Sequence, residues 1–410
     1  MSLPVPDSDA LAASHALQLQ IAAEIAQQEG ANPVATPGAT AGARHDVTPA
    51  ALPDPMRGAI SFARFMELAL YAPKLGYYSG GAAKLGKDGD FTTAPEISAL
   101  FGAALAQVAA AIIAQSSPNI LEFGAGTGKL ARDVLTAMAD KGVQIDSYAI
   151  MELSGELRAR QQEALKDFPQ VSWLDAFPAT FSGVVLANEV LDAMPVQLVR
   201  KDAEGWRELC VTVEDGAFAF TPRVPDGPLL ARIASQIPEA DTLIEGYLTE
   251  VHAVASGFMA TLGRMLAAGK GAAILVDYGF PAHEYYLDQR IGGTLMCHYR
   301  HHAHPEPFYL PGLQDITAHV DFTAMALAAQ DAGADVLGYM NQASFLLGAG
   351  IGELLLALDP DDPKRYLPQA SAVQLLVSPA EMGELFKVLV VGHGVTLPEA
   401  LLKADRTHRL

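Results

Sequence analysis

The glycine-rich stretch EFGAGTG at residues 122–128 constrains the fold of this chain more than any other feature. It lies between 119–123, an apolar run of strand length, and 129–140, a run with helical character. Glycine at alternate positions lets a backbone turn sharply and approach a ligand without Cβ clashes, and a helix N-terminus behind it offers free N–H groups. A dinucleotide-binding turn needs its third glycine one position later, where Lys129 stands. The dinucleotide pattern therefore fails by one residue, and an ordinary glycine-rich turn is the alternative to a ligand site.

Apolar runs of strand length alternate with helical runs in the middle of the chain. The predicted strands are 119–123, 147–152 and 183–188, and the predicted helices between them are 129–140 and 154–166. Strands that alternate with helices join by right-handed crossovers into a parallel sheet. The sequence therefore predicts an α/β fold with a mainly parallel, doubly wound, Rossmann-like sheet.

The alternation is interrupted between residues 201 and 248. Residues 206–213 and 217–220 flank the dipeptide Asp215-Gly216, which is typical of a hairpin turn. We expect this stretch to form an inserted subdomain on the substrate side, built from the hairpin and a helix. The helical pattern then resumes at 249–268, followed by predicted strands at 272–278 and 386–391.

The N-terminal part of the chain differs from the middle in its composition and in its hydrophobic pattern. Residues 8–29 have a helical pattern with four large apolar side chains near one face, Leu11, Leu17, Ile21 and Ile25. Residues 30–55 have linker composition, and we expect the segment 1–55 to be poorly ordered. Further helices are predicted at 61–70 and 97–115, with a loop between them.

The excess of acidic residues narrows the choice of partners. The chain of 410 residues has 27 Lys and Arg against 47 Asp and Glu, a net charge of −20. Such a chain repels phosphate backbones and anionic lipid, so we expect neither nucleic acid nor a membrane as partner, and a basic protein segment suits it better. Two cysteines fit a reducing compartment, and we see no signal peptide or transmembrane run. We therefore expect a cytoplasmic location.

The form E-x-G-x-G-x-G resembles the first motif of S-adenosylmethionine (SAM) methyltransferases. In those enzymes the glycines pack against the amino-acid part of the cofactor, and the preceding acid orients its ammonium. Glu152 ends the next predicted strand, where an acid would accept hydrogen bonds from both ribose hydroxyls; a helix-start carboxylate beside Ser154 is the alternative. Together these motifs predict SAM as the cofactor, bound by Glu122, Gly124, Gly126, Gly128 and Glu152.

A third motif, NEVLDAMP at residues 188–195, follows the predicted strand 183–188. It would lie at the carboxyl edge of the sheet, where open α/β folds hold their ligands. Glu189 and Asp192 are three residues apart and would share one side of a helical turn. Two carboxylates suit a guanidinium group, whose planar N–H groups donate bidentate hydrogen bonds to a carboxylate. Acids favoured by a helix dipole are the alternative.

Six segments in order resemble the MidA family of SAM-dependent methyltransferases, which includes the mitochondrial complex I assembly factor. They are DFTTAPEIS at 90–98, EFGAGTG, NEVLDAMPV at 188–196, VDYG at 276–279, GTLMCHYR at 293–300 and DITAHVDF at 315–322. The resemblance covers about residues 56–395. It implies a class I methyltransferase fold and, for the mitochondrial members, symmetric dimethylation of an arginine in a complex I subunit. It also implies that Asn188 and Glu189 line the junction of cofactor and acceptor.

We divide the chain accordingly into five parts. They are the N-terminal segment 1–55, a helical and lid region 56–118, the first half of the SAM-binding core 119–200, the insertion 201–248, and the second half of the core with acceptor-side elements 249–410. Thr92, Thr93 and Pro95 would form a lid over SAM, with a structural connector as the equal alternative. Tyr278 would help to wall the acceptor pocket.

The expected function is a SAM-dependent protein-arginine methyltransferase that acts on a respiratory complex I subunit or a similar protein. Glu189, with Asp192 and Asn188, would bind the guanidinium and keep its charge away from the attacking nitrogen. A small-molecule methyltransferase and a SAM-binding assembly chaperone remain the alternatives. Four histidines occur between His298 and His304, but no nearby cysteine supports a metal and the chemistry needs none, so we expect no metal site.

Overall fold

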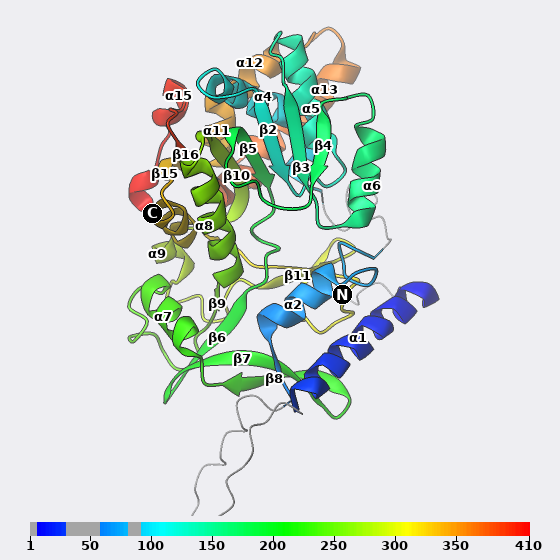
Figure 1. The fold of residues 1–410 in the computed structure, drawn as a ribbon, viewed down its shortest axis with the longest axis vertical. Helices are drawn as coiled ribbons and strands as arrows, with labels where there is room; N and C mark the ends of the chain where they lie inside the picture. The colour runs from blue at the N-terminus through cyan, green and yellow to red at the C-terminus, as the bar shows by residue number, and fades with distance from the viewer. Residues whose placement is uncertain (1–5, 30–57, 81–91) are drawn as a thin grey trace, which may run out of the picture.

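The computed structural model describes residues 6–29, 58–80 and 92–410 of the chain. Figure 1 shows two bodies, an upper one built on a large sheet and a lower one built on a smaller sheet with two N-terminal helices beside it. A third, small sheet lies near the junction between them. In the described residues no helix is long and apolar enough to span a bilayer.

The large sheet carries the predicted α/β pattern. Its strand order is β15-β16-β10-β5-β2-β3-β4, with β14 paired to β10. The strands are β2 (Asn119–Phe123), β3 (Ser147–Met151), β4 (Val171–Leu174), β5 (Ser182–Asn188), β10 (Lys270–Phe280), β14 (Val320–Asp321), β15 (Asp335–Asn341) and β16 (Phe386–His393). The pairs from β10 through β4 are parallel, whereas β16 runs antiparallel to both of its neighbours. The mainly parallel sheet is therefore confirmed.

Helices cover both faces of this sheet, which gives two separate apolar cores. One core contains the buried sides of α4 (Ala99–Ile113) and α5 (Lys129–Asp140). The other contains those of α8 (Ala253–Ala267) and α10 (Phe322–Asp331). Alternate residues of β5 face opposite cores, Val184 and Leu186 on one side and Val185 and Ala187 on the other. The doubly wound arrangement is thus a direct result of strands that are apolar on both faces.

Further helices complete the upper body. They are α3 (Ala94–Ile97), α6 (Gly155–Ala164), α11 (Gln342–Gly348), α12 (Ile351–Leu356), α13 (Pro363–Val377), α14 (Met382–Leu385), α15 (Glu399–Leu402) and a 3₁₀ turn at Thr407–Arg409. The expected helix at 97–115 is shorter than predicted, because Ser98 is extended and its side chain caps α4 by accepting from the Leu100 N–H at 3.0 Å.

The lower body is an antiparallel sheet in the order β1-β7-β6-β9, with β8 on the other edge of β7. The elements are β1 (Ile60–Ser61), β6 (Gln197–Asp202), β7 (Gly205–Glu214), β8 (Ala217–Arg223), α7 (Gly227–Gln236) and β9 (Leu248–Val251). The hairpin predicted around Asp215 and Gly216 is present, and both residues have positive φ as the turn requires. The helix expected at 249–268 begins only at Ala253, because the residues before it pair with β6.

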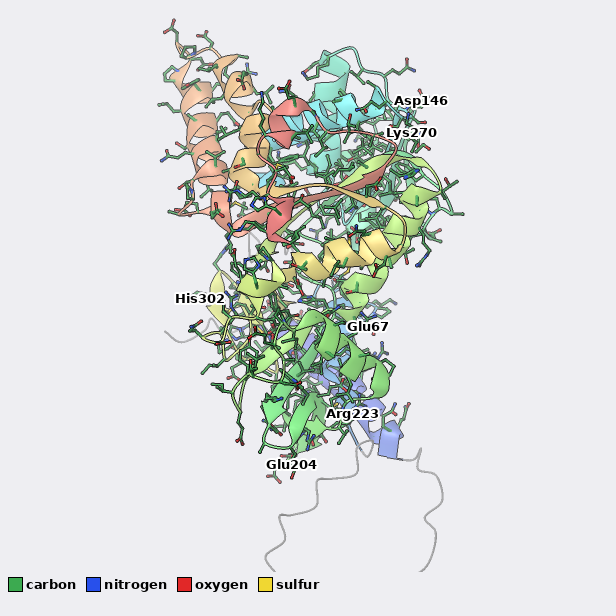
Figure 2. All side chains as sticks on the ribbon, turned by 90° about the vertical axis from the view of Figure 1, so that its left-hand side faces the viewer. Glu67, Asp146, Glu204, Arg223, Lys270 and His302 are labelled. Atoms are coloured by element: carbon green, nitrogen blue, oxygen red, sulfur yellow. The ribbon has the colours of Figure 1, made fainter. Side chains whose placement is uncertain are left out.

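The small sheet has the order β12-β11-β13, and α9 (Ala282–Tyr285) precedes it. Its strands are β11 (Met296–Tyr299), β12 (His302–His304) and β13 (Asp315–Thr317). The histidine cluster lies on this hairpin, and Figure 2 shows His302 at the outer edge of the molecule between the two bodies. No group of three or more His, Cys, Asp or Glu side chains in the described residues is placed to hold a metal.

The expectation that residues 1–55 are poorly ordered is wrong for α1 (Ser8–Glu29). Leu17 and Ile21 are fully buried in a core shared with α2 (Phe62–Tyr71), and the Ser14 hydroxyl donates to the Pro311 carbonyl at 2.8 Å. Leu11 was assigned to the same face but is 42% exposed. The linker at 30–55 lies entirely outside the described residues.

Candidate cofactor and acceptor site

A cavity of about 490 Å³ lies at the carboxyl ends of β2, β3 and β5. We call it the central cavity. Nine of the ten site residues expected from the sequence line it: Thr93, Pro95, Glu122, Gly124, Gly126, Glu152, Asn188, Glu189 and Asp192. Gly128 is not among the lining residues. Three motifs far apart in the sequence therefore meet at one place, as the carboxyl ends of neighbouring parallel strands must.

The glycine-rich turn makes the floor of the central cavity. Gly124, Gly126 and Gly128 all have positive φ, at 62°, 53° and 82°, a backbone region that other residues rarely adopt. A Cβ built on Gly124 would lie 3.1 Å from the Val190 Cγ2 atom, so the turn is also close-packed. Gly128 is the N-cap of α5, and its place is structural because it shapes the turn without lining the cavity.

Glu122 is nearly fully buried at the end of β2. The Tyr148 hydroxyl donates a hydrogen bond of 2.7 Å to its Oε2 atom. Burial raises the pKa of Glu122 to about 7, although the tyrosine bond opposes this rise. A cationic group in the cavity would therefore contact the Glu122 carboxyl group, which is already desolvated and which the Tyr148 hydrogen bond partly orients.

Glu152 is oriented by a side chain that the sequence analysis missed. Its Oε2 atom accepts a bond of 2.8 Å from the Gln161 side-chain amide, which also donates to the Gly126 carbonyl at 3.0 Å. Gln161 in turn accepts from the Trp173 indole N–H at 3.0 Å. Gln161 is fully buried. Its neighbours in α6 are mostly polar, so nothing in the sequence distinguishes it from the exposed polar residues of the same helix. It ties the acid to the glycine-rich turn.

The other Glu152 oxygen, Oε1, accepts from the backbone N–H of Ser154 at 2.9 Å. The alternative of a helix-start carboxylate beside Ser154 is therefore also realised, and the same residue lines the cavity. Burial raises the pKa of Glu152, while these hydrogen bonds lower it.

Asn188 and Glu189 lie where β5 ends. Glu189 does not begin a helical turn, contrary to the expectation, because its φ is 52° and the residues after it form a loop. The Asn188 side-chain amide donates to Glu189 Oε1 at 3.0 Å. A backbone N–H bond from Ala94 also reaches the Glu189 carboxylate. Burial, followed by the charge of Asp192, raises the pKa of Glu189 to about 8.

Asp192 completes the acidic side of the cavity. Burial raises its pKa to about 6, against a hydrogen bond from the Tyr278 side chain. Two buried oxygens here have no hydrogen-bond partner among the described residues, Asn188 Oδ1 and Asp192 Oδ1. Buried acceptors without donors are costly, so this side of the cavity is built to receive N–H or O–H donors. Tyr278 was expected to wall the acceptor pocket, but it contacts Asp192 from behind and is not among the lining residues.

Two tyrosines of the N-terminal region, which no sequence motif indicated, also line the cavity. Tyr71 and Tyr78 are stacked with ring centroids 5.5 Å apart, and both line the cavity. The Tyr71 hydroxyl donates to the Ala193 carbonyl at 2.9 Å, and that of Tyr78 donates to Asp315 Oδ1 at 3.0 Å. Tyr71 therefore joins α2 to the loop 189–194 that carries Glu189 and Asp192, which we call the acidic loop, and Tyr78 bonds to β13 of the small sheet.

A group of three phenylalanines lines another part of the cavity. Phe123 lies 5.0 Å, centroid to centroid, from both Phe177 and Phe258, and all three line the cavity with the exposed Leu153. Such a wall suits a flat, apolar ring system.

Thr93 and Pro95 lie at the start of α3 on the cavity rim. Next to them, Glu96 Oε1 accepts from the Thr127 hydroxyl at 2.5 Å, which joins α3 to the glycine-rich turn. Thr93 and Pro95 thus lie at the cavity rim, where a lid would lie. The bond between Glu96 and Thr127 also makes this segment a structural connector between α3 and the glycine-rich turn.

The chain was compared with known proteins. Residues 100–340 match a family described as "Putative S-adenosyl-L-methionine-dependent methyltransferase". A Danio rerio protein named protein arginine methyltransferase NDUFAF7, mitochondrial, is 30% identical over 369 residues, which covers 82% of this chain and 83% of its own. The Mus musculus protein of the same name is 31% identical over 368 residues and covers 80% of each chain.

A solved structure matches over the whole length. It is a "likely methyl transferase" from Burkholderia thailandensis, crystallised with S-adenosyl-homocysteine bound, at 49% identity and a TM-score of 0.87 over 100% of both chains. The class I methyltransferase fold expected from the sequence is confirmed by this match.

The cytoplasmic location expected from the sequence is wrong by these comparisons, since the curated relatives are named as mitochondrial proteins. The expectation depends on the low cysteine count, which does not separate one reducing compartment from another.

The family match covers more than half of the chain, and it agrees with the glycine-rich turn, the acid after β3 and the cavity between them. The chain therefore belongs to the family of SAM-dependent methyltransferases, and its resemblance to the MidA family is confirmed.

Proposed function

We propose that the protein transfers a methyl group from SAM to an arginine side chain of a protein. The observation that carries this proposal is the pair of buried, unpartnered oxygens, Asn188 Oδ1 and Asp192 Oδ1, beside the Glu189 carboxylate in the central cavity. The cations that line the described cavity, Lys129 and Arg158, already pair with Asp133 and Asp175. A guanidinium would supply both the charge and the N–H donors that this acidic side lacks.

The residues of the cavity fit SAM as the cofactor. Gly124 has a positive φ and no side chain, so its backbone can approach the cofactor's amino-acid part, and Glu122 would bind the ammonium. Glu152, held by Gln161, would accept from the ribose hydroxyls. The aromatic group around Phe123 would receive the adenine ring. These assignments explain why each group is buried at the same cavity.

SAM supplies a methyl group that is already activated as a sulfonium substituent, so the protein mainly has to align the nucleophile. An arginine nitrogen is a poor nucleophile because its lone pair is delocalised and its pKa exceeds about 12. Glu189 would hold two N–H groups of the guanidinium and draw its charge away from the attacking nitrogen. As the new N–C bond forms and the C–S bond breaks, that nitrogen loses one proton, for which the free Asp192 Oδ1 is an available acceptor.

The protein acceptor is supported by the curated relatives, which are named as protein arginine methyltransferases. A neutral small molecule would leave Glu189 and Asp192 without a counter-charge. The net charge of −20 favours a basic protein segment. The resemblance to the MidA family makes a respiratory complex I subunit the first acceptor to examine.

The proposal is tested by incubating the protein with methyl-labelled SAM and a lysate of its host. We expect label in one or a few protein bands. Label confined to the small-molecule fraction would instead show a small-molecule methyltransferase. Binding of SAM without any transfer would leave an assembly role in its place, and either result would overturn the proposal.

A further inference from the structure

We propose that Asp277, at the carboxyl end of β10, is a positioning residue for methyl transfer, because it holds the loop that carries Glu189 and Asp192 in its functional shape. The catalytic part of this inference, the effect of Asp277 on methyl transfer, rests on the proposed function. Its structural part stands on the hydrogen bonds of one buried carboxylate and can be tested separately.

Asp277 lies behind the acidic loop rather than in the cavity. It is 1% exposed and is not among the lining residues. Its Oδ2 atom accepts from three successive backbone N–H groups, those of Val190, Leu191 and Asp192, at 3.1, 2.9 and 3.3 Å. Successive N–H groups that converge on one anion form a nest, a shape that a loop adopts around a negative group. The loop therefore surrounds a carboxyl group supplied by a neighbouring strand, and burial and the charges of Asp192 and Glu189 raise the pKa of that group well above its ordinary value.

The nest accounts for the unusual backbone of Glu189. Val276 pairs with Asn188 in the parallel ladder, and the Glu189 N–H still donates to the Val276 carbonyl at 2.8 Å. The chain must then leave the sheet abruptly so that the next three N–H groups can turn toward Asp277. The left-handed conformation of Glu189, at φ 52°, makes that turn. Without the acceptor, one partly buried and two buried N–H groups would lose their partner, and the conformation would lose its support.

The neighbouring contacts lock the same arrangement from other directions. Asp277 Oδ1 accepts from the Tyr278 N–H at 2.9 Å, so the carboxylate cannot turn away. The Tyr278 side chain bonds to Asp192. At the far end of the loop, the Ala318 N–H donates to the Asp192 carbonyl at 3.0 Å. Asp277 thus accepts from three successive N–H groups of the loop, and these further contacts hold the residues around them.

The test uses two substitutions and a matched control in the full-length protein. Asp277→Ala removes the acceptor, whereas Asp277→Asn keeps one oxygen that the nest can use. Asp321→Ala is the control: Asp321 is equally buried at 1%, lies on the strand β14 that pairs with β10, and accepts from the Ala324 N–H away from the cavity. The readouts are amide hydrogen exchange at residues 190–192, S-adenosyl-homocysteine affinity by calorimetry, and kcat and KM for methyl transfer.

For Asp277→Ala we expect loss of exchange protection at Val190, Leu191 and Asp192, unchanged S-adenosyl-homocysteine affinity, and a fall in kcat of about 100-fold, the scale of a displacement near 1 Å. Asp277→Asn should recover part of both protection and kcat. If Asp277→Ala does not fold, the Asn variant alone decides, with partial loss at the same three amides.

Exchange at 190–192 that matches the Asp321→Ala control would overturn the inference, and so would full turnover in both Asp277 variants. Because the exchange readout needs no acceptor, a failure of the proposed arginine chemistry would leave protection at these amides interpretable. The two failures are therefore distinguishable.

Discussion

Among single residues, Glu189 combines a left-handed backbone, a buried carboxylate and a place at the cavity wall. We expect Glu189→Gln to lower kcat/KM for methyl transfer by about 100-fold, the scale on which a lost charge-assisted bond and misalignment act together. S-adenosyl-homocysteine affinity should stay unchanged in calorimetry. Turnover equal to the wild type with the cofactor still bound would remove Glu189 from the mechanism.

The pH profile gives a second test of the same residue. Only the ionised carboxylate attracts a guanidinium, and burial raises the pKa of Glu189 to about 8 and that of Asp192 to about 6. We therefore expect kcat/KM of the wild type to rise with pH through this window. The rise near pH 8 should be missing in Glu189→Gln, which keeps only the lower one. A profile that is flat from pH 6 to 8.5 in the wild type would contradict the assignment.

Gln161 allows a matched comparison within one helix. Gln161→Leu removes the donor to both Glu152 and the Gly126 carbonyl, and we expect S-adenosyl-homocysteine to bind about tenfold more weakly, as for the loss of one hydrogen bond to a charged group. The control is Gln162→Leu, since Gln162 is the next residue and is exposed. Calorimetry on the three proteins decides; equal weakening in both variants would point to a general effect on α6.

The site residues that could be predicted from the sequence are those that belong to a recognisable motif. Glu122, Glu152 and Glu189 each lie at or next to the carboxyl end of a predicted strand, so their common location follows from the rule for parallel sheets. Gln161, Tyr71 and Tyr78 could not be found this way. Their side chains reach the site from a helix face and from the N-terminal region, and only tertiary packing brings them there.

Among the elements, α1 differs most from what the sequence suggested. Leu17 and Ile21 are fully buried against α2 and the lower sheet. We expect Ile21→Ala to lower the free energy of unfolding by about 2–4 kcal/mol, the range for a large-to-small change in a packed core. Leu19→Ala, at a position 58% exposed on the same helix, should cost less than about 0.5 kcal/mol. Urea unfolding of both variants checks this; equal costs would mean that α1 does not dock as described.

Some helices and strands could be predicted from local sequence patterns, and others could not. The strands β2, β3, β5 and β10 are apolar runs bounded by turn residues, and the hairpin around Gly216 has its own local signal, so each could be predicted. The docking of α1 depends on contacts with residues some 40 or more positions away, such as the pair of Glu24 with Arg64. The helical turn predicted at Glu189 failed because a carboxylate from β10 organises that loop.

For the whole molecule, buried carboxyl groups make stability depend on pH. Burial raises the pKa of Glu122 to about 7, of Asp321 to about 7 and of Glu189 to about 8. The folded protein therefore holds protons that the unfolded chain has released. This part of the stability is fully present below about pH 4, the ordinary range of these groups, and is lost as pH rises to about 8.

We therefore expect the melting temperature of the ligand-free protein to fall between pH 5.5 and 8.5, measured by circular dichroism. Repulsion from the net charge of −20 acts in the same direction, and added salt screens it. Glu189→Gln should flatten the fall at any salt concentration, because it removes one of the buried groups. A melting temperature that rises across this range, or a variant with the wild-type slope, would contradict the pKa assignments.

The central claim is that this molecule places a guanidinium nitrogen beside the cofactor cavity, between Glu189 and Asp192. The most direct measurement is mass spectrometry of protein labelled with methyl-deuterated SAM, after proteolysis, to identify the residue that carries the label. The account predicts deuterated methylarginine in the acceptor protein, and none with Glu189→Gln. Label on lysine, on a carboxyl group or on a small molecule, with arginine unlabelled, would contradict it.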